Sequence, residues 1–381
     1  MKKEHKELIN ISLKYKRREY LKYISFIKFF AMIIIIKWHL VRHISWGFHI
    51  GGRMVEILFV SSGFLVGYNY FNIPINSTYD YSFKYTYNHL RVFYPLYLIN
   101  TIINLAENKI IYNYINRKPF SILTNIEIIL IKITLLQTWS RYIDSIFNEA
   151  SWFISALFLS YFLSPLLLKG IKNIKISVTL FFTVSFTLFL VEYFVKNGAI
   201  NLFQTNIYFG PIIRLLEFYM GMLMIPLFFY IKIKFNKIIR YKKMMKVLFT
   251  IIQIFAPIQQ YFIMRKYNYL YNCYHVIFCC FFIFIIANDL GYLSNIINNK
   301  ILSILMSCQY EMYILQFRFN FIFKSYYYLK LKNKNILYKE IFFHLNLLLI
   351  FLISYVFKIL LKDKLAKLMD NILLLITKIF Y

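Results

Sequence analysis

The chain has 381 residues, of which 60% are hydrophobic, 21% aromatic and only 16% charged, and its formal net charge is +29. Soluble domains are about half apolar and a quarter charged, so this composition excludes an ordinary soluble globular protein and predicts a polytopic membrane protein. The positive charge does not indicate nucleic-acid binding, because the basic residues cluster in short segments between apolar runs and no DNA-binding motif accompanies them. We expect those segments to contact anionic lipid headgroups instead.

Apolar runs long enough to cross about 30 Å of hydrocarbon recur along the chain. Ten membrane spans are predicted, near residues 24–42, 54–71, 89–106, 152–168, 174–195, 206–230, 246–264, 270–287, 301–323 and 340–361. An eleventh apolar stretch, 122–139, is shorter and contains Glu127 and Lys132. The basic loops can face one side of the membrane only if this stretch does not cross completely. We therefore predict that it is interfacial or re-entrant and covered by protein.

The predicted fold class is an all-α integral membrane bundle of about ten transmembrane helices without a soluble domain. Residues 1–22 are expected to form a basic cytoplasmic N-terminus and 23–361 the transmembrane domain. Residues 362–381 are expected to form a basic, partly interfacial tail. The positions of the basic segments predict a multi-pass protein of the inner or plasma membrane with both termini in the cytoplasm.

Four cysteines, at positions 273, 279, 280 and 308, all lie in apolar stretches without metal-binding spacing. They are typical of small hydrophobic residues inside helices. We expect no metal site and no permanently bound cofactor.

The first span contains three residues that lipid disfavours, Lys28, Lys37 and His39. On a helix, eleven residues make three turns plus about 20°, with a rise near 16 Å, so Lys28 and His39 share a face. Lys37 points the opposite way and can extend to the interface. An intramembrane charge on an inward face indicates function. Lys28 is suited to hold phosphates of a cytoplasmic donor and His39 to accept a proton, although an interfacial His39 beside Trp38 is the simpler alternative.

The second span contains Glu56, Ser62 and Gly63. Glu56 lies across a short loop from His39 and is a candidate to orient its imidazole. The pair Ser62 and Gly63 permits close approach of another helix, a packing role that needs no chemistry.

Three further charged residues are candidates. Arg91, at a cytoplasmic helix start, is either a positive-inside anchor or a phosphate clamp. Arg214 and Glu217 are three residues apart and are expected to pair with each other. They either fix their helix or bind an acceptor.

Six segments, in order, resemble the membrane-bound acyltransferase 3 family. They are "ISFIKFFAMIIIIKWH", "VEILFVSSGFL", "LRVFYPLY", "ASWFISALFLSYFLSPLL", "RLLEFYMGML" and "YEMYILQF", spread over about residues 18–320. The first is similar to the family's motif of Arg or Lys, ten residues and His. The resemblance implies transfer of an acyl group, usually acetyl from acetyl-CoA, to a hydroxyl of a cell-surface polysaccharide or lipid-linked glycan.

The same resemblance implies the site. His39 would be the catalytic base, Lys28 and Arg91 would serve acyl-CoA, and Ser62 and Gly63 would shape the channel. Trp152, which begins the Trp-led segment, is assigned with Arg214 and Glu217 to acceptor binding.

The chain departs from the family pattern at four places. Asn88 stands where a second basic residue is expected, Gln316 replaces a late histidine and Ser25 replaces an aspartate. The acidic residue expected after the Trp152 segment is missing. A catalytically inactive member therefore stays an alternative, as does a transporter or flippase of lipid-linked oligosaccharides, although the latter typically shows repeat symmetry that this sequence lacks.

Overall fold

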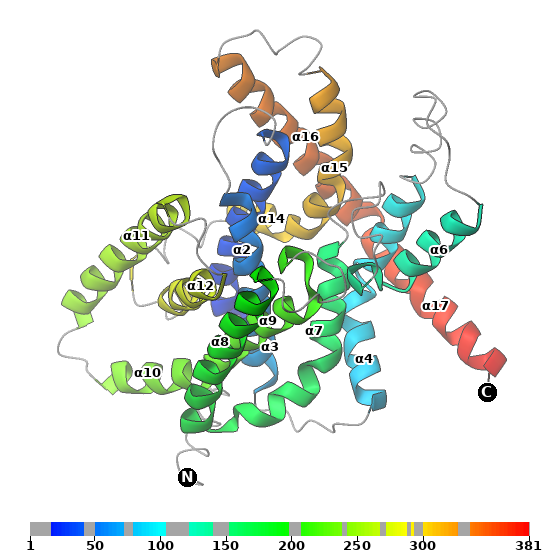
Figure 1. Ribbon diagram of the computed structural model, residues 1–381. Coiled ribbons are helices and arrows are strands. Elements are labelled where there is room, and N and C mark those ends of the chain that lie inside the picture. Colours follow the sequence, from blue (N-terminus) through cyan, green and yellow to red (C-terminus); the bar gives the residue numbers. More distant parts are fainter. Residues whose placement is uncertain are drawn as a thin grey trace. The chain divides into compact units, whose positions relative to one another are not determined.

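The computed structural model describes residues 17–41, 50–71, 79–103, 122–139, 152–197, 207–237, 242–266, 272–287, 291–292, 300–326 and 336–380. Within these ranges the regular structure is helical, without a strand (Figure 1). The α-helices are α2 (Arg17–Val41), α3 (Ile50–Tyr70), α4 (Tyr79–Leu90), α6 (Ile122–Ile133), α7 (Trp152–Leu168), α8 (Ile174–Lys196), α9 (Pro211–Leu223), α10 (Ile225–Lys237), α11 (Lys242–Lys266), α12 (Asn272–Ala287), α14 (Lys300–Ser307), α15 (Gln309–Tyr326), α16 (Ile336–Leu360) and α17 (Lys362–Phe380). Residues 94–103 form a further short helix. The all-α fold class is confirmed.

The chain divides into two compact units. The first comprises residues 1–82, 162–201 and 212–307, and the second comprises residues 83–161, 202–211 and 308–381. In the first unit α2 packs along α3, and α12 contacts α2, α3 and α8. In the second unit α15 packs on α16, and α16 on α17. The predicted boundaries at residues 22 and 361 remain predictions.

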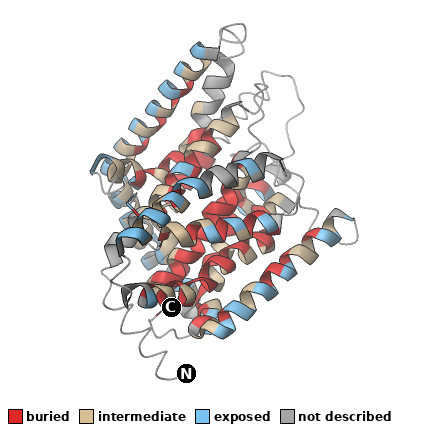
Figure 2. Cartoon of the chain, turned by 90° about the vertical axis from the view of Figure 1, so that its left-hand side faces the viewer, coloured by how far each residue is buried: buried red, intermediate tan, exposed pale blue. Residues whose placement is uncertain are grey.

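Four helical segments in the described ranges are long and apolar enough to cross a membrane: Trp152–Ile171, Ile174–Val195, Pro211–Lys232 and Leu337–Leu360. Large apolar side chains are exposed on α8 and α16, among them Phe182 at 68% and Leu345 at 56%. Buried and exposed positions alternate along single helices in Figure 2. A continuous apolar face open to the surroundings is expected where a helix contacts lipid. The protein is therefore a membrane protein, and the number of ten spans stays a prediction.

Three of the predicted spans are interrupted. The span expected at 206–230 begins at Pro211 and continues to Lys232 through a one-residue turn at Met224, which separates α9 from α10. Pro226 explains this turn, because proline lacks the amide hydrogen that would bond within the helix and its ring disfavours helical backbone before it. The span expected at 89–106 is divided by a turn at residues 91–93, just before Pro95, and the span expected at 301–323 is divided at Cys308.

The stretch 122–139 does not form a spanning helix. Helix α6 has 12 residues and rises about 18 Å, less than the hydrocarbon thickness. The chain then turns at Leu135, whose φ is 58°, into a short 3-10 helix at Gln137–Trp139. The Ser155 hydroxyl donates to the Leu135 carbonyl and the Tyr97 hydroxyl to the Lys132 carbonyl. These two side-chain hydroxyls thus bind backbone carbonyls that would be unpaired if the turn faced lipid. A re-entrant segment requires such hydrogen bonds from the surrounding protein.

Helices α3 and α9 approach so closely that glycine is required on both. A Cβ added at Gly63 would lie 1.8 Å from the Phe218 carbonyl oxygen, and one added at Gly221 would lie 2.0 Å from the Val60 carbonyl oxygen. Each glycine thus faces the backbone of the other helix, as is common where membrane helices pack. The packing role expected of Gly63 is confirmed.

We expect Gly63→Ala to destabilise the protein by about 1–3 kcal/mol, because the backbone at Phe218 must move to admit the methyl group. Gly170→Ala is the matched control, since its Cβ would meet the Tyr219 hydroxyl at an ordinary 3.4 Å. Thermal unfolding of the purified variants in detergent measures the difference. Equal midpoints for both variants would contradict the tight packing of α3 on α9.

Candidate functional site

Helix α2 is continuous from Arg17 to Val41, so it carries Lys28 and His39 on one face as the spacing predicts. Both side chains are half-buried. His39 lies in the last turn, and its imidazole packs against the Trp38 ring with 4.7 Å between ring centres. The contact with Trp38 is the one expected for an interfacial histidine, and it leaves part of the imidazole accessible to a substrate.

Lys28 and Ser62 are brought together. The Lys28 ammonium donates to the Ser62 hydroxyl at 3.1 Å, and that hydroxyl donates in turn to the Leu58 carbonyl at 2.6 Å. Ser62 is buried. Among the described residues, no carboxylate pairs with Lys28, so one neutral hydroxyl is the partner that the structure gives its charge. A half-buried cation held in this way is suited to bind an anion.

Glu56 pairs with Arg53 rather than with His39. Its Oε1 accepts from the Arg53 guanidinium at 2.8 Å, one turn away on α3. Its other carboxylate oxygen, Oε2, is buried and has no hydrogen-bond partner among the described residues. In this arrangement Glu56 does not orient the imidazole of His39, and its predicted catalytic role remains a prediction. Arg53 is not among the predicted site residues.

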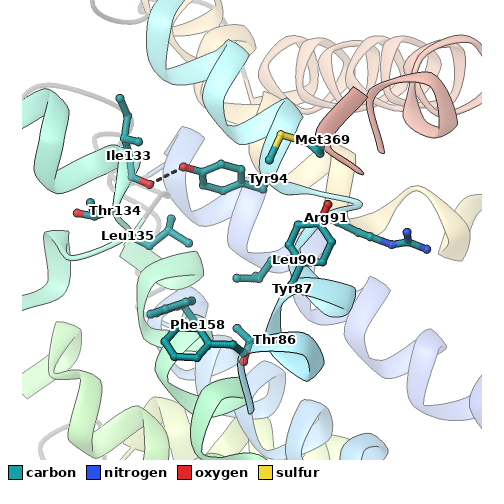
Figure 3. A pocket seen from close by; sticks show the side chains of 11 residues that line it. Thr86, Tyr87, Leu90, Arg91, Tyr94, Ile133, Thr134, Leu135, Phe158 and Met369 are labelled. Atoms are coloured by element: carbon teal, nitrogen blue, oxygen red, sulfur yellow. Dashed lines mark hydrogen bonds between the residues drawn. The ribbon is translucent and has the colours of Figure 1, made fainter. Parts of the chain in front are cut away.

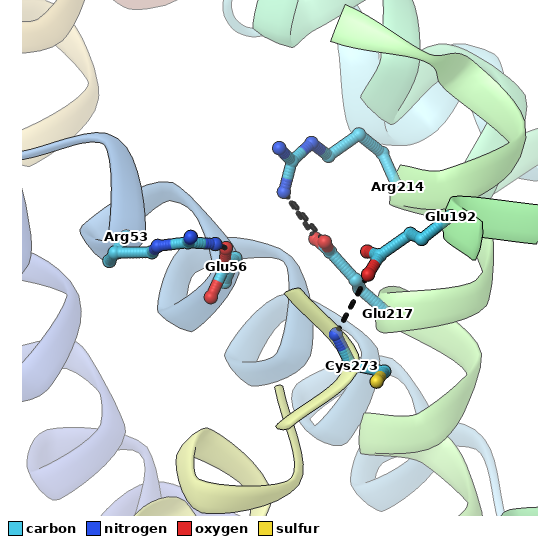
Figure 4. Close-up of polar contacts among 6 residues, drawn as sticks. All are labelled: Arg53, Glu56, Glu192, Arg214, Glu217 and Cys273. Carbon is cyan, nitrogen blue, oxygen red and sulfur yellow. Dashed lines mark hydrogen bonds and ion pairs between the residues drawn. The ribbon is translucent and has the colours of Figure 1, made fainter. Parts of the chain in front are cut away.

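Arg214 and Glu217 form the expected pair on α9. The Arg214 Nη1 lies 2.7 Å from both carboxylate oxygens, and both side chains are completely buried. The guanidinium carbon also lies 5.7 Å from the centre of the Phe59 ring on α3. Figure 4 shows the pair beside Glu192. Because each charge already has its partner, this geometry explains a structural role, and acceptor binding stays a prediction.

Glu192 is a buried acidic residue that is not among the predicted site residues. It lies near the end of α8, in a span where it is the one acidic residue, and is completely buried. Its carboxylate accepts a long hydrogen bond, 3.4 Å, from the Cys273 amide at the start of α12, where the helix dipole favours a negative charge. The signal that identifies it is simply one ionisable residue within an apolar span.

Arg91 belongs to the second unit, where it binds a carboxylate. Its Nη1 donates to both oxygens of Asp370 on α17, at 2.8 and 3.1 Å, and the Tyr87 hydroxyl donates to the same carboxylate at 2.8 Å. These hydrogen bonds, from Tyr87 and then Arg91, lower the pKa of Asp370, while burial and the bond to Asp370 raise the pKa of Tyr87 to about 12. Arg91 therefore pairs with an acidic side chain in this structure, and its predicted role towards acyl-CoA stays a prediction.

Trp152, also in the second unit, is buried in an aromatic cluster. Its ring centre lies 5.1 Å from those of both Tyr208 and Phe209. Its side chain is only 6% exposed among the described residues, and the acceptor-binding role of Trp152 stays a prediction. Gln316 is also buried, and its Nε2 donates to the Tyr313 carbonyl. The part of the chain that the structure describes contains no cluster of metal-binding side chains.

The family model of acyltransferase 3, described as an acyltransferase domain, matches residues 21–363. The chain belongs to the acyltransferase 3 family. It is therefore a membrane acyltransferase, and the resemblance drawn from the six motifs is confirmed at the level of the family. No curated protein and no solved structure matches this acyltransferase.

Breaking the buried pair of this acyltransferase should be costly. Glu217→Gln leaves the Arg214 charge buried without its carboxylate, and we expect a loss of about 3–5 kcal/mol of stability. The double variant Arg214→Met/Glu217→Leu removes both charges and should recover most of that loss. Thermal unfolding in detergent tests the comparison. A double variant less stable than Glu217→Gln would show that the charges are needed for more than neutralising each other.

Proposed function

We propose that this membrane acyltransferase transfers an acyl group, most simply acetyl, from acyl-CoA to a hydroxyl of a cell-surface polysaccharide or lipid-linked glycan. The observation that carries the proposal is the arrangement on α2, where Lys28, a cation without a carboxylate partner among the described residues, shares one helix face with the half-buried His39. Family membership supports acyl transfer, and a cation at Lys28 suits the phosphates of a CoA donor. The proposed location is the plasma or inner membrane, with acyl-CoA as a substrate rather than a resident cofactor.

The proposed mechanism assigns the proton to His39. Its imidazole takes the proton of the acceptor hydroxyl while that oxygen attacks the thioester carbonyl. The new ester forms, the carbon–sulfur bond breaks, and the CoA thiolate leaves and regains a proton. Neutral histidine suits this step because its ordinary pKa lies near neutral pH. A covalent acyl-enzyme is not needed, since the hydroxyl can attack the donor directly.

The proposed donor side includes Lys28, with Ser62 holding the ammonium in position. About 16 Å separates Lys28 from His39 along α2. An extended donor can have its phosphates at one end of such a distance and its thioester at the other. Gly63 allows α9 to approach α3 directly beside Ser62, and so supports this side of the helix pair.

His39→Ala should abolish acyl transfer, because no other described group on this face of α2 can accept the proton. His344→Ala is the matched control: His344 is exposed on α16 and its imidazole contacts the Glu340 carbonyl of its own helix. A deletion strain complemented with each variant is grown, and the ester-linked acetyl groups on its purified surface polysaccharide are measured by NMR. Equal acetyl content in the His39→Ala and wild-type strains would exclude the catalytic role. Loss of the polymer itself would favour the flippase.

Lys28→Ala should raise the KM for acetyl-CoA about tenfold or more, because one charge-assisted contact to phosphate is lost, with a smaller effect on kcat. Lys28→Arg should largely preserve KM. Lys37→Ala, which changes a lysine on the opposite face of the same helix, is the control. The measurement is the initial rate against acetyl-CoA concentration in isolated membranes. If Lys28→Ala leaves KM unchanged, Lys28 does not serve the donor.

A further inference from the structure

A cavity of about 260 Å³ lies within the second unit, between α4, α6, α7 and α17. Its apolar lining includes Leu90 of α4, Leu135 of the turn after α6, Phe158 of α7 and Met369 of α17 (Figure 3). The volume is slightly below the range of about 300–1,000 Å³ that is usual for small-molecule sites. The size and the lining together favour a narrow apolar ligand.

The hydroxyl groups beside the re-entrant turn bond to the protein itself. The Tyr94 hydroxyl donates to the Ile133 carbonyl, as Figure 3 shows, and the Thr134 hydroxyl donates to the Leu130 carbonyl of its own helix at 2.8 Å. Both hydroxyls belong to residues that line the cavity. Their hydrogen atoms are therefore not available to a ligand inside it.

One edge of the cavity is polar, and there the protein provides both partners. Nη1 of Arg91 and the Tyr87 hydroxyl donate to the carboxylate of Asp370 on α17. In Figure 3 the Arg91 guanidinium points away from the apolar side chains. The interior is thus apolar although its edge carries charges. An apolar cavity stays dry and is filled by hydrocarbon rather than by water.

The cavity opens onto an apolar surface. Phe83 and Ile133 both line it and are 60% and 45% exposed. Leu136, beside the turn, and Leu368 on α17 are exposed as well. In a membrane protein an exposed apolar rim of this kind faces hydrocarbon. A chain from the surrounding lipid can therefore enter without crossing a polar surface.

The re-entrant turn gains support from an occupied cavity. Leu135 has a φ of 58°, a left-handed backbone conformation that is unusual for leucine. Such a conformation persists only where the surrounding contacts determine it. The Ser155 hydroxyl supplies one contact, at the Leu135 carbonyl. The Leu135 side chain lines the cavity, so a hydrocarbon chain packed there supplies another.

We propose that this cavity holds one hydrocarbon chain of a membrane lipid, which enters past Phe83 and Ile133 and packs against Leu90 and Leu135. Each methylene group that becomes buried favours binding about fourfold. The chain belongs either to a phospholipid or to the lipid part of a lipid-linked glycan acceptor. The second source rests on the proposed function, whereas the site itself depends only on the membrane location of the protein.

The test uses the full-length protein in nanodiscs that contain phosphatidylcholine with a diazirine at the end of one acyl chain. Irradiation crosslinks the chain to its neighbours, and mass spectrometry of the peptides identifies the residues. We expect crosslinks to Leu90 and Leu135, because lipid that stays on the surface does not reach these buried side chains. Phe182, which is exposed on α8, reports contact with bulk lipid and is the reference for the yield.

A pair of variants on α17 locates the effect. Met369→Trp should lower the crosslinks to Leu90 about fourfold or more, because the larger side chain displaces at least one methylene group of the lipid. Leu368→Trp is the matched control, since this neighbouring residue is exposed and does not line the cavity. Thr134→Trp narrows the cavity from the re-entrant turn and should cause the same loss. Size-exclusion chromatography verifies the folding of each variant.

Addition of unlabelled polyprenyl phosphate separates the two sources of the chain. Loss of the crosslinks to Leu90 and Leu135 supports the lipid part of a lipid-linked glycan, and unchanged crosslinks support a phospholipid. The proposal is overturned if the wild-type protein gives no crosslinks to these two residues, or if Met369→Trp and Leu368→Trp give equal yields. A failure of the proposed function would appear as absent acyl transfer in wild type, with these crosslinks unaffected.

Discussion

The close backbone contact between α3 and α9 positions the polar side chains of the first unit. Gly63 and Gly221 let each helix reach the carbonyl oxygens of the other, so two helices share a space normally filled by side chains. Ser62 stands next to this contact and accepts from Lys28, and the Arg214–Glu217 pair lies on the α9 side of it. A bulkier residue at Gly63 would therefore disturb both the cation proposed to bind donor and the buried ion pair.

Arg214 and Lys28, two cations of the first unit, differ in how the protein compensates their charge. Arg214 has a carboxylate at 2.7 Å and an aromatic ring beside it, so its charge is neutralised within the protein. Lys28, in contrast, has the neutral hydroxyl of Ser62 as its hydrogen-bond partner. The free-energy cost of moving a charge out of water is offset only by a partner of opposite charge or by good hydrogen bonds. The residue with the weaker compensation is the one expected to gain most from an anionic substrate.

The features of the fold that depend on local helix geometry could be predicted from the sequence. The contacts between residues far apart in the sequence could not. The shared face of Lys28 and His39 and the pairing of Arg214 with Glu217 follow from helix geometry alone. Pro226 is a signal for a helix interruption, but the continuous apolar run around it predicts a single span without the turn at Met224. Asp370 lies 279 residues from Arg91, and no local pattern connects them. Proximity along the chain predicts that Glu56 orients His39, whereas Arg53, one turn away, is its ion-pair partner in the structure.

The long sequence separation of the α17 contact also affects assembly. The second unit combines residues 83–161 with residues 308–381, and contacts such as Asn100 to the Ile314 carbonyl span 214 positions. At a synthesis rate of about 5–20 residues per second, Arg91 emerges roughly 15 to 55 seconds before Asp370. During that interval the guanidinium cannot pair with Asp370. The nascent first unit can pack its glycine contact well before the second unit is able to close.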